Sequence, residues 1–311
     1  MKKFIVFLVF VFIFYYVYNN RDYIITYVMK NYFDKNKITL GDKNIYYKDF
    51  DYSFVQNTDS LEPNNRQDIL NIIYTTLNRG LDEVTFYCPY SYENCINDVN
   101  DIADNSLYLS SINNLVHPFN SYSNIYFSIS NYRKIHITVS RIYTDDYVSF
   151  VNNEINNISD SIINSDMSIY DKIKSFHDYI INNTIYDSSV NLTNQLYSSN
   201  NSNNAYGLLL NNKAICSGYS DVMAIFLSRL GLNNYRISSD VHIWNLVFFD
   251  NSWKHIDVTW DDPVTSNGSN LLLHDFFLID TDELYKKEEE IFQDDNKDNH
   301  RYDKSIYIEA N

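Results

Sequence analysis

The sequence predicts an α+β fold, with a helix that begins at a cysteine and an antiparallel hairpin that carries a histidine and an aspartate. Two observations lead to this prediction. Apolar residues recur with helical spacing in several segments, including the one that follows Cys216. Other segments are rich in β-prone residues and flank short turns, a pattern typical of antiparallel hairpins.

The length of 311 residues allows one large domain or two small ones. The net charge is −16 and no basic stripe is present, so we expect no nucleic-acid partner. An Asn-rich run over residues 191–204 is interpreted as a polar surface loop.

The first 20 residues contain an apolar run from Phe4 to Tyr18, preceded by Lys2 and Lys3. The run is shorter than the roughly 20 residues of a usual membrane span, and it also fits a signal-peptide core. No small-residue cleavage site follows, and aromatic residues end the run. We therefore interpret residues 1–20 as an uncleaved signal-anchor, with a cleaved signal peptide or a buried helix as alternatives.

The two lysines predict that the short N-terminal end stays in the cytoplasm. We then expect a single-pass membrane protein with most of its chain outside the cytoplasm. If the signal is cleaved, the protein would be secreted instead.

Residues 35–165 are expected to form an N-terminal α+β region, in which we find no chemistry. Helical periodicity or a strand pattern marks each of its elements. The expected helices cover residues 66–79, 94–104 and 149–163, the expected strand covers 83–88, and the expected hairpin covers 123–140.

Cys88 and Cys95 are close neighbours in this region. Outside the cell they could form a disulfide and leave Cys216 as the odd cysteine; the alternative is three unrelated thiols. No second Cys or His pair with ligand spacing lies nearby, so the spacing does not support a zinc site.

Beyond residue 165, a helix is expected to start at Ser168, where Asp171 completes a pattern similar to a capping box. A second helix follows Cys216 and ends at Gly231. At the start of that helix, unpaired backbone N–H groups and the helix dipole can stabilise a thiolate or an oxyanion. A lone cysteine at a helix start is nevertheless structural more often than catalytic.

The segment after this helix strengthens the catalytic interpretation. Two β-prone runs flank Asp250 and Asn251, which suit a two-residue hairpin loop. Such a loop makes His242 and Asp257 diagonal neighbours on one face, within side-chain reach. A histidine oriented by a carboxylate is what a thiol nucleophile needs, because the imidazolium favours the thiolate. A loop one residue longer or shorter would separate the two side chains.

The order Cys, His, Asp resembles the transglutaminase-like superfamily, which has a papain-like thiol fold. The motifs that carry the resemblance are AICSGYSDVMAIFLSRLGL, HIWNLV and SWKHIDVTWDDP, and they are most similar to bacterial membrane-anchored proteins of this type. Residues 170–187 and 274–284 resemble the helix before the nucleophile and the closing segment. The resemblance implies a catalytic domain over residues 166–285 and leaves 286–311 as a charged C-terminal tail.

The resemblance implies Cys216 as nucleophile, His242 as general base and acid, and Asp257 as the residue that orients His242. It does not settle the oxyanion side chain, for which we take Tyr206 as the candidate, with backbone N–H groups alone as the alternative.

Four further residues, Gly218, Tyr219, Trp244 and Trp260, are expected to line the site, with core packing as the alternative for the tryptophans. Asp261, Asp262, His274 and Asp275 could suggest a metal, but a solvated turn explains the acids more simply. We therefore predict no metal and no cofactor.

The expected activity is thiol-dependent acyl transfer or hydrolysis on peptide or protein amides, as in a cysteine peptidase, an amidase or a protein-glutamine acyltransferase. The location suggests cell-wall peptides or surface proteins as substrates. A binding or scaffold module that keeps the fold is the main alternative, and a metal-binding surface protein is a third.

Overall fold

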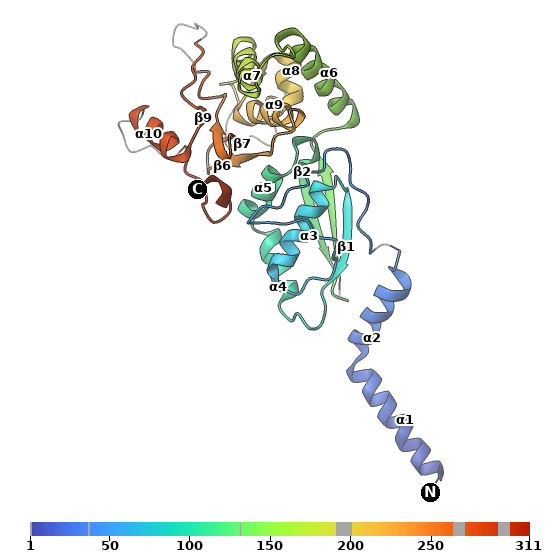
Figure 1. Ribbon diagram of the computed structural model, residues 1–311. Coiled ribbons are helices and arrows are strands. Elements are labelled where there is room, and N and C mark those ends of the chain that lie inside the picture. The colour runs from blue at the N-terminus through green and yellow to red at the C-terminus, as the bar shows by residue number, and fades with distance from the viewer. Residues whose placement is uncertain (1, 37, 131, 191–200, 264–270, 292–298) are drawn as a thin grey trace.

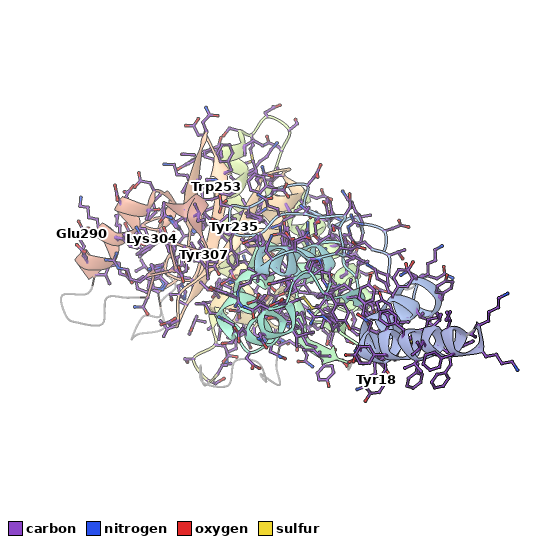
Figure 2. The ribbon with its side chains drawn as sticks, turned by 90° about the horizontal axis from the view of Figure 1, so that it is seen from below. Tyr18, Tyr235, Trp253, Glu290, Lys304 and Tyr307 are labelled. Atoms are coloured by element: carbon purple, nitrogen blue, oxygen red, sulfur yellow. A yellow bond between two sulfur atoms is a disulfide. The ribbon has the colours of Figure 1, made fainter. Side chains whose placement is uncertain are left out.

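The computed structural model describes residues 2–36, 38–130, 132–190, 201–263, 271–291 and 299–311. Two N-terminal helices, α1 (Lys2–Asn19) and α2 (Arg21–Val28), project from the packed body (Figure 1). Helix α1 is long and apolar enough to cross a membrane, and none of its residues is buried. The alternative of a buried N-terminal helix is therefore wrong, and Figure 2 shows α1 extending away from the packed body beyond Tyr18.

The N-terminal region consists of a three-stranded antiparallel sheet in the order β1-β3-β2, with helices packed on it (Figure 1). The expected hairpin is confirmed, because Phe127 pairs with Ile137 and Ile129 with Ile135. The Asn65 side chain caps the first helix of this region, α3, and Gly80 follows the end of α3 with a φ of 73°. The elements are α3 (Arg66–Asn78), β1 (Glu83–Tyr87), α4 (Cys95–Ala103), α5 (Ser106–Leu115), β2 (Tyr122–Ile129) and β3 (Lys134–Arg141).

A disulfide joins Cys88, the residue after β1, to Cys95, the first residue of α4. Both residues are fully buried in the core of this region. The bond therefore fixes the end of the strand against the start of the helix and leaves Cys216 as the free cysteine.

Four helices form a second layer, and their apolar residues share one core. The Ser168 side chain caps α7, as the sequence predicts, and Thr144 caps α6. Helix α6 contributes Val151 and Ile155 to this core. The expected domain boundary near residue 165 lies after α6, so it places α6 in a different domain from the helices with which it packs. The helices are α6 (Asp145–Ile162), α7 (Ile169–Asn183), α8 (Ala205–Asn211) and α9 (Cys216–Arg229). Most of the expected Asn-rich loop, residues 191–200, lies outside the described residues.

The second sheet is antiparallel, in the order β6-β7-β8-β9. Asp250 and Asn251 both adopt left-handed backbone conformations, with φ of 51° and 62°, as a two-residue hairpin loop of type I′ requires. Phe249 therefore pairs with Ser252, which confirms the expected register. The strands are β6 (Asn234–Ser238), β7 (Ile243–Phe249), β8 (Ser252–Ile256) and β9 (Phe277–Ile279), and α10 (Thr281–Ile291) follows β9.

Buried polar contacts hold α9 against this sheet. The Asn245 side chain of β7 donates a hydrogen bond of 2.9 Å to the Ser220 carbonyl in α9. Arg236 of β6 pairs with Asp221 of α9 and also donates to the carbonyl of Asn113 in α5. The helix that begins with Cys216 is thus fixed relative to both the sheet and the N-terminal region, and the expected α+β fold is confirmed.

Residues 299–311, which the sequence analysis assigns to a charged tail, pack into the protein. Tyr302, Ile306 and Tyr307 are buried, and Tyr307 stacks on Tyr235 of β6, close to it in Figure 2. A bridge between Ser239 and Tyr302 adds backbone contact beside the sheet. The structure differs from the expectation because the apolar residues of this segment, spaced too irregularly to predict an element, bury their side chains against β6 and β7.

Candidate active site

Cys216 is the first residue of α9 and is 2% exposed. The short parallel pair β4 (Ile185–Tyr186) and β5 (Lys213–Ala214) leads the chain into it. Ile215 is in the N-cap position with extended backbone, and its side chain has no oxygen with which to cap the first turn. The first N–H groups of α9 are thus not used by a capping side chain and can stabilise negative charge beside the sulfur.

Gly218 lies where the end of the Asn-rich run and strand β5 meet the first turn of α9. A Cβ atom at this position would lie 2.7 Å from the Ser202 carbonyl oxygen and 2.9 Å from the Ala214 Cβ. The glycine therefore permits close backbone approach beneath Cys216, and it does not line the pocket described below.

His242 and Asp257 form a buried pair, as the hairpin register predicts. His242 Nε2 lies 2.6 Å from Asp257 Oδ2. The second carboxylate oxygen, Oδ1, accepts from the backbone N–H groups of Thr259 and Trp260 at 3.0 and 3.2 Å. Since Nε2 is used by the carboxylate, Nδ1 is the ring nitrogen left to meet Cys216, whose side chain is a hydrogen-bonding neighbour of His242.

The electrostatics of the pair favour charge on both partners. Burial by itself lowers the pKa of His242, but the charge and hydrogen bond of Asp257, together with Cys216, outweigh it and raise that pKa to about 10. Burial likewise opposes ionisation of Asp257, yet His242 and His300 hold its pKa well below the usual range. The site therefore keeps an imidazolium beside the thiol at neutral pH.

His300 is a site residue that the sequence analysis missed. Its side chain is fully buried, and Nε2 lies 2.8 Å from the same Asp257 Oδ2 that bonds His242. Its other ring nitrogen lies 3.4 Å from Oε1 of Glu288, a buried residue of α10. No motif marks His300 in the sequence, where it lies between Asn299 and Arg301 in a segment rich in charged residues.

Three aromatic side chains enclose the His300 ring, with ring centroids 4.5 Å away for Trp260, 4.8 Å for Trp244 and 5.3 Å for Phe276. Trp244 also stacks on His242, and its Nε1 donates to His255 Nδ1 at 2.9 Å. Trp244 thus packs behind the histidines, whereas Trp260 lines the pocket.

A pocket of about 620 Å³ opens at Cys216 and His242. Trp260 and Phe276 form part of its apolar wall, and Asp262 contributes a carboxylate whose pKa burial raises to about 6. Tyr219 lies beneath, where its hydroxyl donates to Asp262 Oδ2 at 2.6 Å. The remaining described lining residues are Tyr186, Val241, Thr259, Pro263, Leu271, Leu273, Asp275, Ile291 and Asn299.

The expected oxyanion residue, Tyr206, is not among the described residues that line this pocket. Its ring stacks on Tyr147 of α6 with centroids 3.7 Å apart, because its position on α8 faces that helix. Tyr186 lies beside the sulfur instead, since it pairs with Ala214, two residues before Cys216. Burial, followed by Cys216 and Asp257, raises the pKa of Tyr186 to about 12, so its hydroxyl remains a hydrogen-bond donor.

Comparison with known proteins finds a family match over this part of the chain. A family model described as the transglutaminase-like superfamily matches residues 156–258, a third of the chain that includes Cys216, His242 and Asp257. The expected fold, α+β with a transglutaminase-like core, is thereby confirmed. No curated protein matches the chain.

Two solved structures are similar to the chain over less than half of its length. A TGase is 20% identical, covering 45% of this chain and 44% of its own, with a TM-score of 0.32. A "Putative Cysteine Protease" from Cytophaga hutchinsonii is 12% identical, covering 48% of this chain and 65% of its own, with a TM-score of 0.29. The chain thus spans less than two thirds of either protein.

Proposed function

We propose that the transglutaminase-like domain of this chain catalyses thiol-dependent acyl transfer or hydrolysis on peptide or protein amides. The observation that carries the proposal is the buried His242–Asp257 pair, 2.6 Å between Nε2 and Oδ2, in the pocket that also contains Cys216. A scaffold that only keeps the fold has no need of a buried ion pair beside a thiol, because burying charges costs free energy.

In the first step, the Cys216 thiolate attacks the amide carbonyl carbon. A C–S bond forms, and the carbonyl π electrons move to the oxygen. The first N–H groups of α9 and the Tyr186 hydroxyl are the donors available to this oxyanion. When the intermediate collapses, the C–N bond breaks and the His242 imidazolium gives its proton to the leaving amine.

In the second step, the thioester is attacked by water or by a second amine. Neutral His242 takes a proton from the attacking group, and the C–S bond breaks to regenerate the thiolate and the imidazolium. Water as acceptor makes the enzyme a peptidase or amidase, and an amine makes it a transglutaminase.

Asp257 would act as the positioning residue for His242, and His300 as the positioning residue for Asp257. The shared oxygen Oδ2 accepts from both histidines, while Oδ1 is held by two backbone N–H groups. A carboxylate with this many donors has little rotational freedom, so it fixes the ring orientation of His242.

The location proposed for this activity is the outer surface of a membrane. Helix α1 is long and apolar enough to act as an anchor, although a signal sequence passes the same test. The buried Cys88–Cys95 disulfide supports an oxidising compartment. Peptides or proteins of the cell surface are then the substrates within reach.

Acylation by p-nitrophenyl acetate tests the proposal without knowledge of the natural substrate. The full chain in detergent micelles is mixed with the ester at pH 6, and intact mass with peptide mapping locates the acetyl group. We expect one acetyl group on Cys216 in the native protein, none there in Cys216→Ala, and much slower acylation in His242→Ala. Added primary amine that shortens the lifetime of the acetyl-enzyme and appears in the product would identify the transferase.

Equal acetylation of Cys216 in the native protein and in His242→Ala would contradict the proposal. It would leave a transglutaminase-like fold that serves as a binding or scaffold module.

A further inference from the structure

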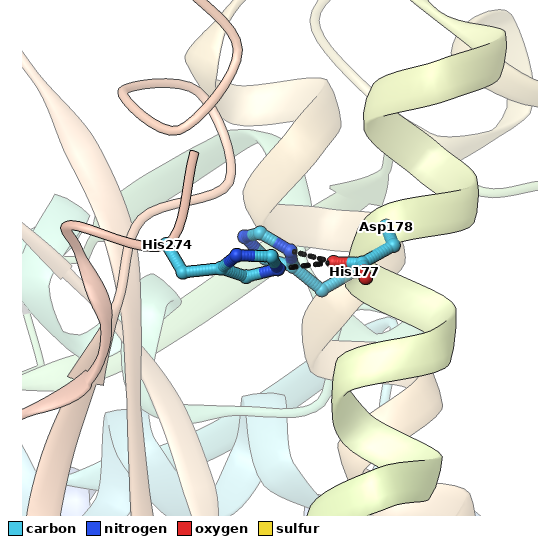
Figure 3. Close-up of side chains that lie close together, drawn as sticks. All are labelled: His177, Asp178 and His274. Carbon is cyan, nitrogen blue, oxygen red and sulfur yellow. Dashed lines mark hydrogen bonds and ion pairs between the residues drawn. The ribbon is translucent and has the colours of Figure 1, made fainter. Parts of the chain in front are cut away.

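A second group of histidine and carboxylate side chains lies outside the proposed catalytic centre (Figure 3). His177 and Asp178 are neighbours on α7, and His274 comes from the segment that precedes β9. Asp178 and His274 are 96 positions apart in the sequence, yet Figure 3 shows the rings of His177 and His274 directed at the same carboxylate of Asp178.

The three side chains present a compact donor set. His177 Nδ1 lies 3.0 Å and His274 Nε2 lies 2.7 Å from Asp178 Oδ1. Donors bound tetrahedrally to Zn²⁺ at 2.0–2.1 Å are roughly 3.3 Å apart, so shifts below about 1 Å would admit the ion between these atoms. Two imidazole nitrogens and one carboxylate oxygen are ligands that Zn²⁺ accepts readily.

The hydrogen-bonding neighbours of His177 and Asp178 also suit a role of these two residues as metal ligands. His177 Nε2 lies 3.2 Å from Asp261 Oδ2, and Asp261 Oδ1 accepts from the Phe276 N–H at 3.0 Å. When Nε2–H is donated to Asp261, the neutral ring has its lone pair on Nδ1, the nitrogen that faces Asp178 and His274. Lys174 Nζ lies 2.7 Å from the second oxygen of Asp178, which leaves Oδ1 for the ion.

The cluster is partly open to solvent. The side chain of His177 is fully buried, while those of Asp178 and His274 are 26% and 34% exposed. An ion could therefore enter from the His274 side and keep a water molecule as its fourth ligand.

We propose that His177 Nδ1, Asp178 Oδ1 and His274 Nε2 bind one Zn²⁺ ion, with Asp261 orienting His177. The ion would fasten α7 to residues 271–276. That segment contributes Leu271, Leu273 and Phe276 to the pocket at Cys216, so the ion would stabilise one wall of the pocket without contacting the thiol. This inference does not depend on the proposed acyl transfer.

The test is a Zn²⁺ titration of the EDTA-stripped full chain in detergent micelles, with a chromophoric chelator as competitor and the melting temperature as a second readout. At 100 times its Kd, Zn²⁺ should raise the melting temperature of a chain of this size by about 5 °C. His274→Ala should weaken binding by about 100-fold or more, and Asp261→Asn by about 10-fold to 100-fold.

Control variants separate this site from other zinc ligands. Cys216→Ala and His242→Ala remove groups of the proposed catalytic centre, where His242, Asp257 and His300 also lie close together. His136→Ala removes a partly exposed histidine of the β2–β3 hairpin that belongs to neither group. All three should bind Zn²⁺ like the native protein.

Absence of Zn²⁺ binding, equal binding by His274→Ala and the native protein, or loss of binding in His242→Ala would each overturn the zinc site. The melting temperature in EDTA checks that each variant is folded, and Asp178→Asn provides a second ligand variant. Failure of the acyl-transfer proposal would show instead as absence of His242-dependent acetylation, with Zn²⁺ binding unchanged.

Discussion

The Asp257→Asn substitution tests whether the carboxylate charge holds His242 in its imidazolium form. The introduced amide can still accept the bond from Nε2, but it carries no charge. In the native protein, the charge of Asp257 helps to raise the pKa of His242 to about 10. Without that charge, burial should lower the pKa of His242. Between pH 6 and 9 the ring should be charged in the native protein and neutral in the variant.

The size of the effect follows from the titration of a thiol. An ordinary thiol with a pKa of 8.5 is ionised to roughly 0.3% at pH 6 and about 75% at pH 9, a rise of about 200-fold. The proposed mechanism requires a thiolate partner for the imidazolium of His242, and the raised pKa of about 10 keeps that imidazolium charged across this range. The alkylation rate of Cys216 should thus change by less than about 3-fold in the native protein and rise about 200-fold in Asp257→Asn.

The assay is iodoacetamide labelling followed by intact mass, with the full chain in detergent micelles and EDTA present. Cys216 is the one cysteine outside the disulfide, so a single mass shift reports on it. The ratio of rates at pH 9 and pH 6 within one protein cancels differences in nucleophilicity and access. His136→Ala should keep the native ratio.

A native protein whose labelling rate also rises about 200-fold, with a profile that superimposes on Asp257→Asn and His242→Ala, would refute the reasoning. The histidine would then be a buried neutral side chain, and the catalytic interpretation would lose its main support.

Three further substitutions test other parts of the structure. His300→Phe removes the second donor to Asp257 while keeping an aromatic ring in the site, so it should lower the free energy of unfolding by about 1.5–3 kcal/mol in urea titrations. His300→Gln, which keeps a donor, should lower it less. Equal losses in the two variants would argue against the hydrogen bond. Tyr186→Phe should slow ester acylation by about 10²–10³-fold and leave the rate of iodoacetamide labelling unchanged, because only acylation forms an oxyanion. A similar fall in both rates would indicate that the nucleophile is misplaced. Replacing both Cys88 and Cys95 by Ala should cost about 2 kcal/mol in the same urea titrations, as expected for a short closed loop, and an unchanged unfolding midpoint would contradict a stabilising disulfide.

Local patterns predicted much of the fold and the centre of the site. The two left-handed residues Asp250 and Asn251 set the register of β7 and β8, and that register brings His242 to Asp257. The start of α9 at Cys216 is equally local, because it depends on the periodicity of the residues that follow. Such features are encoded within a few residues of one another, so the sequence alone could reveal them.

The features that the sequence did not reveal depend on contacts between distant segments. His300 reaches Asp257 across 43 positions, and no local pattern marks that approach. Tyr186 lies beside Cys216 only because β4 and β5 pair in parallel across the Asn-rich loop. Tyr206 is nearer in sequence, but its ring packs against α6, and the direction of a side chain on a short helix depends on that tertiary contact.

The position of His300 in the chain has a consequence for biosynthesis. A ribosome exports Cys216, His242 and Asp257 before it has made residues 299–311, and the domain folds as its parts emerge. Until residues 299–311 dock, Asp257 lacks one of its two histidine donors and the sheet lacks the cover provided by Tyr302 and Tyr307. In a nascent chain that lacks this contact, Asp257 would position His242 less firmly, and the thiol would gain its full reactivity only once residues 299–311 have docked.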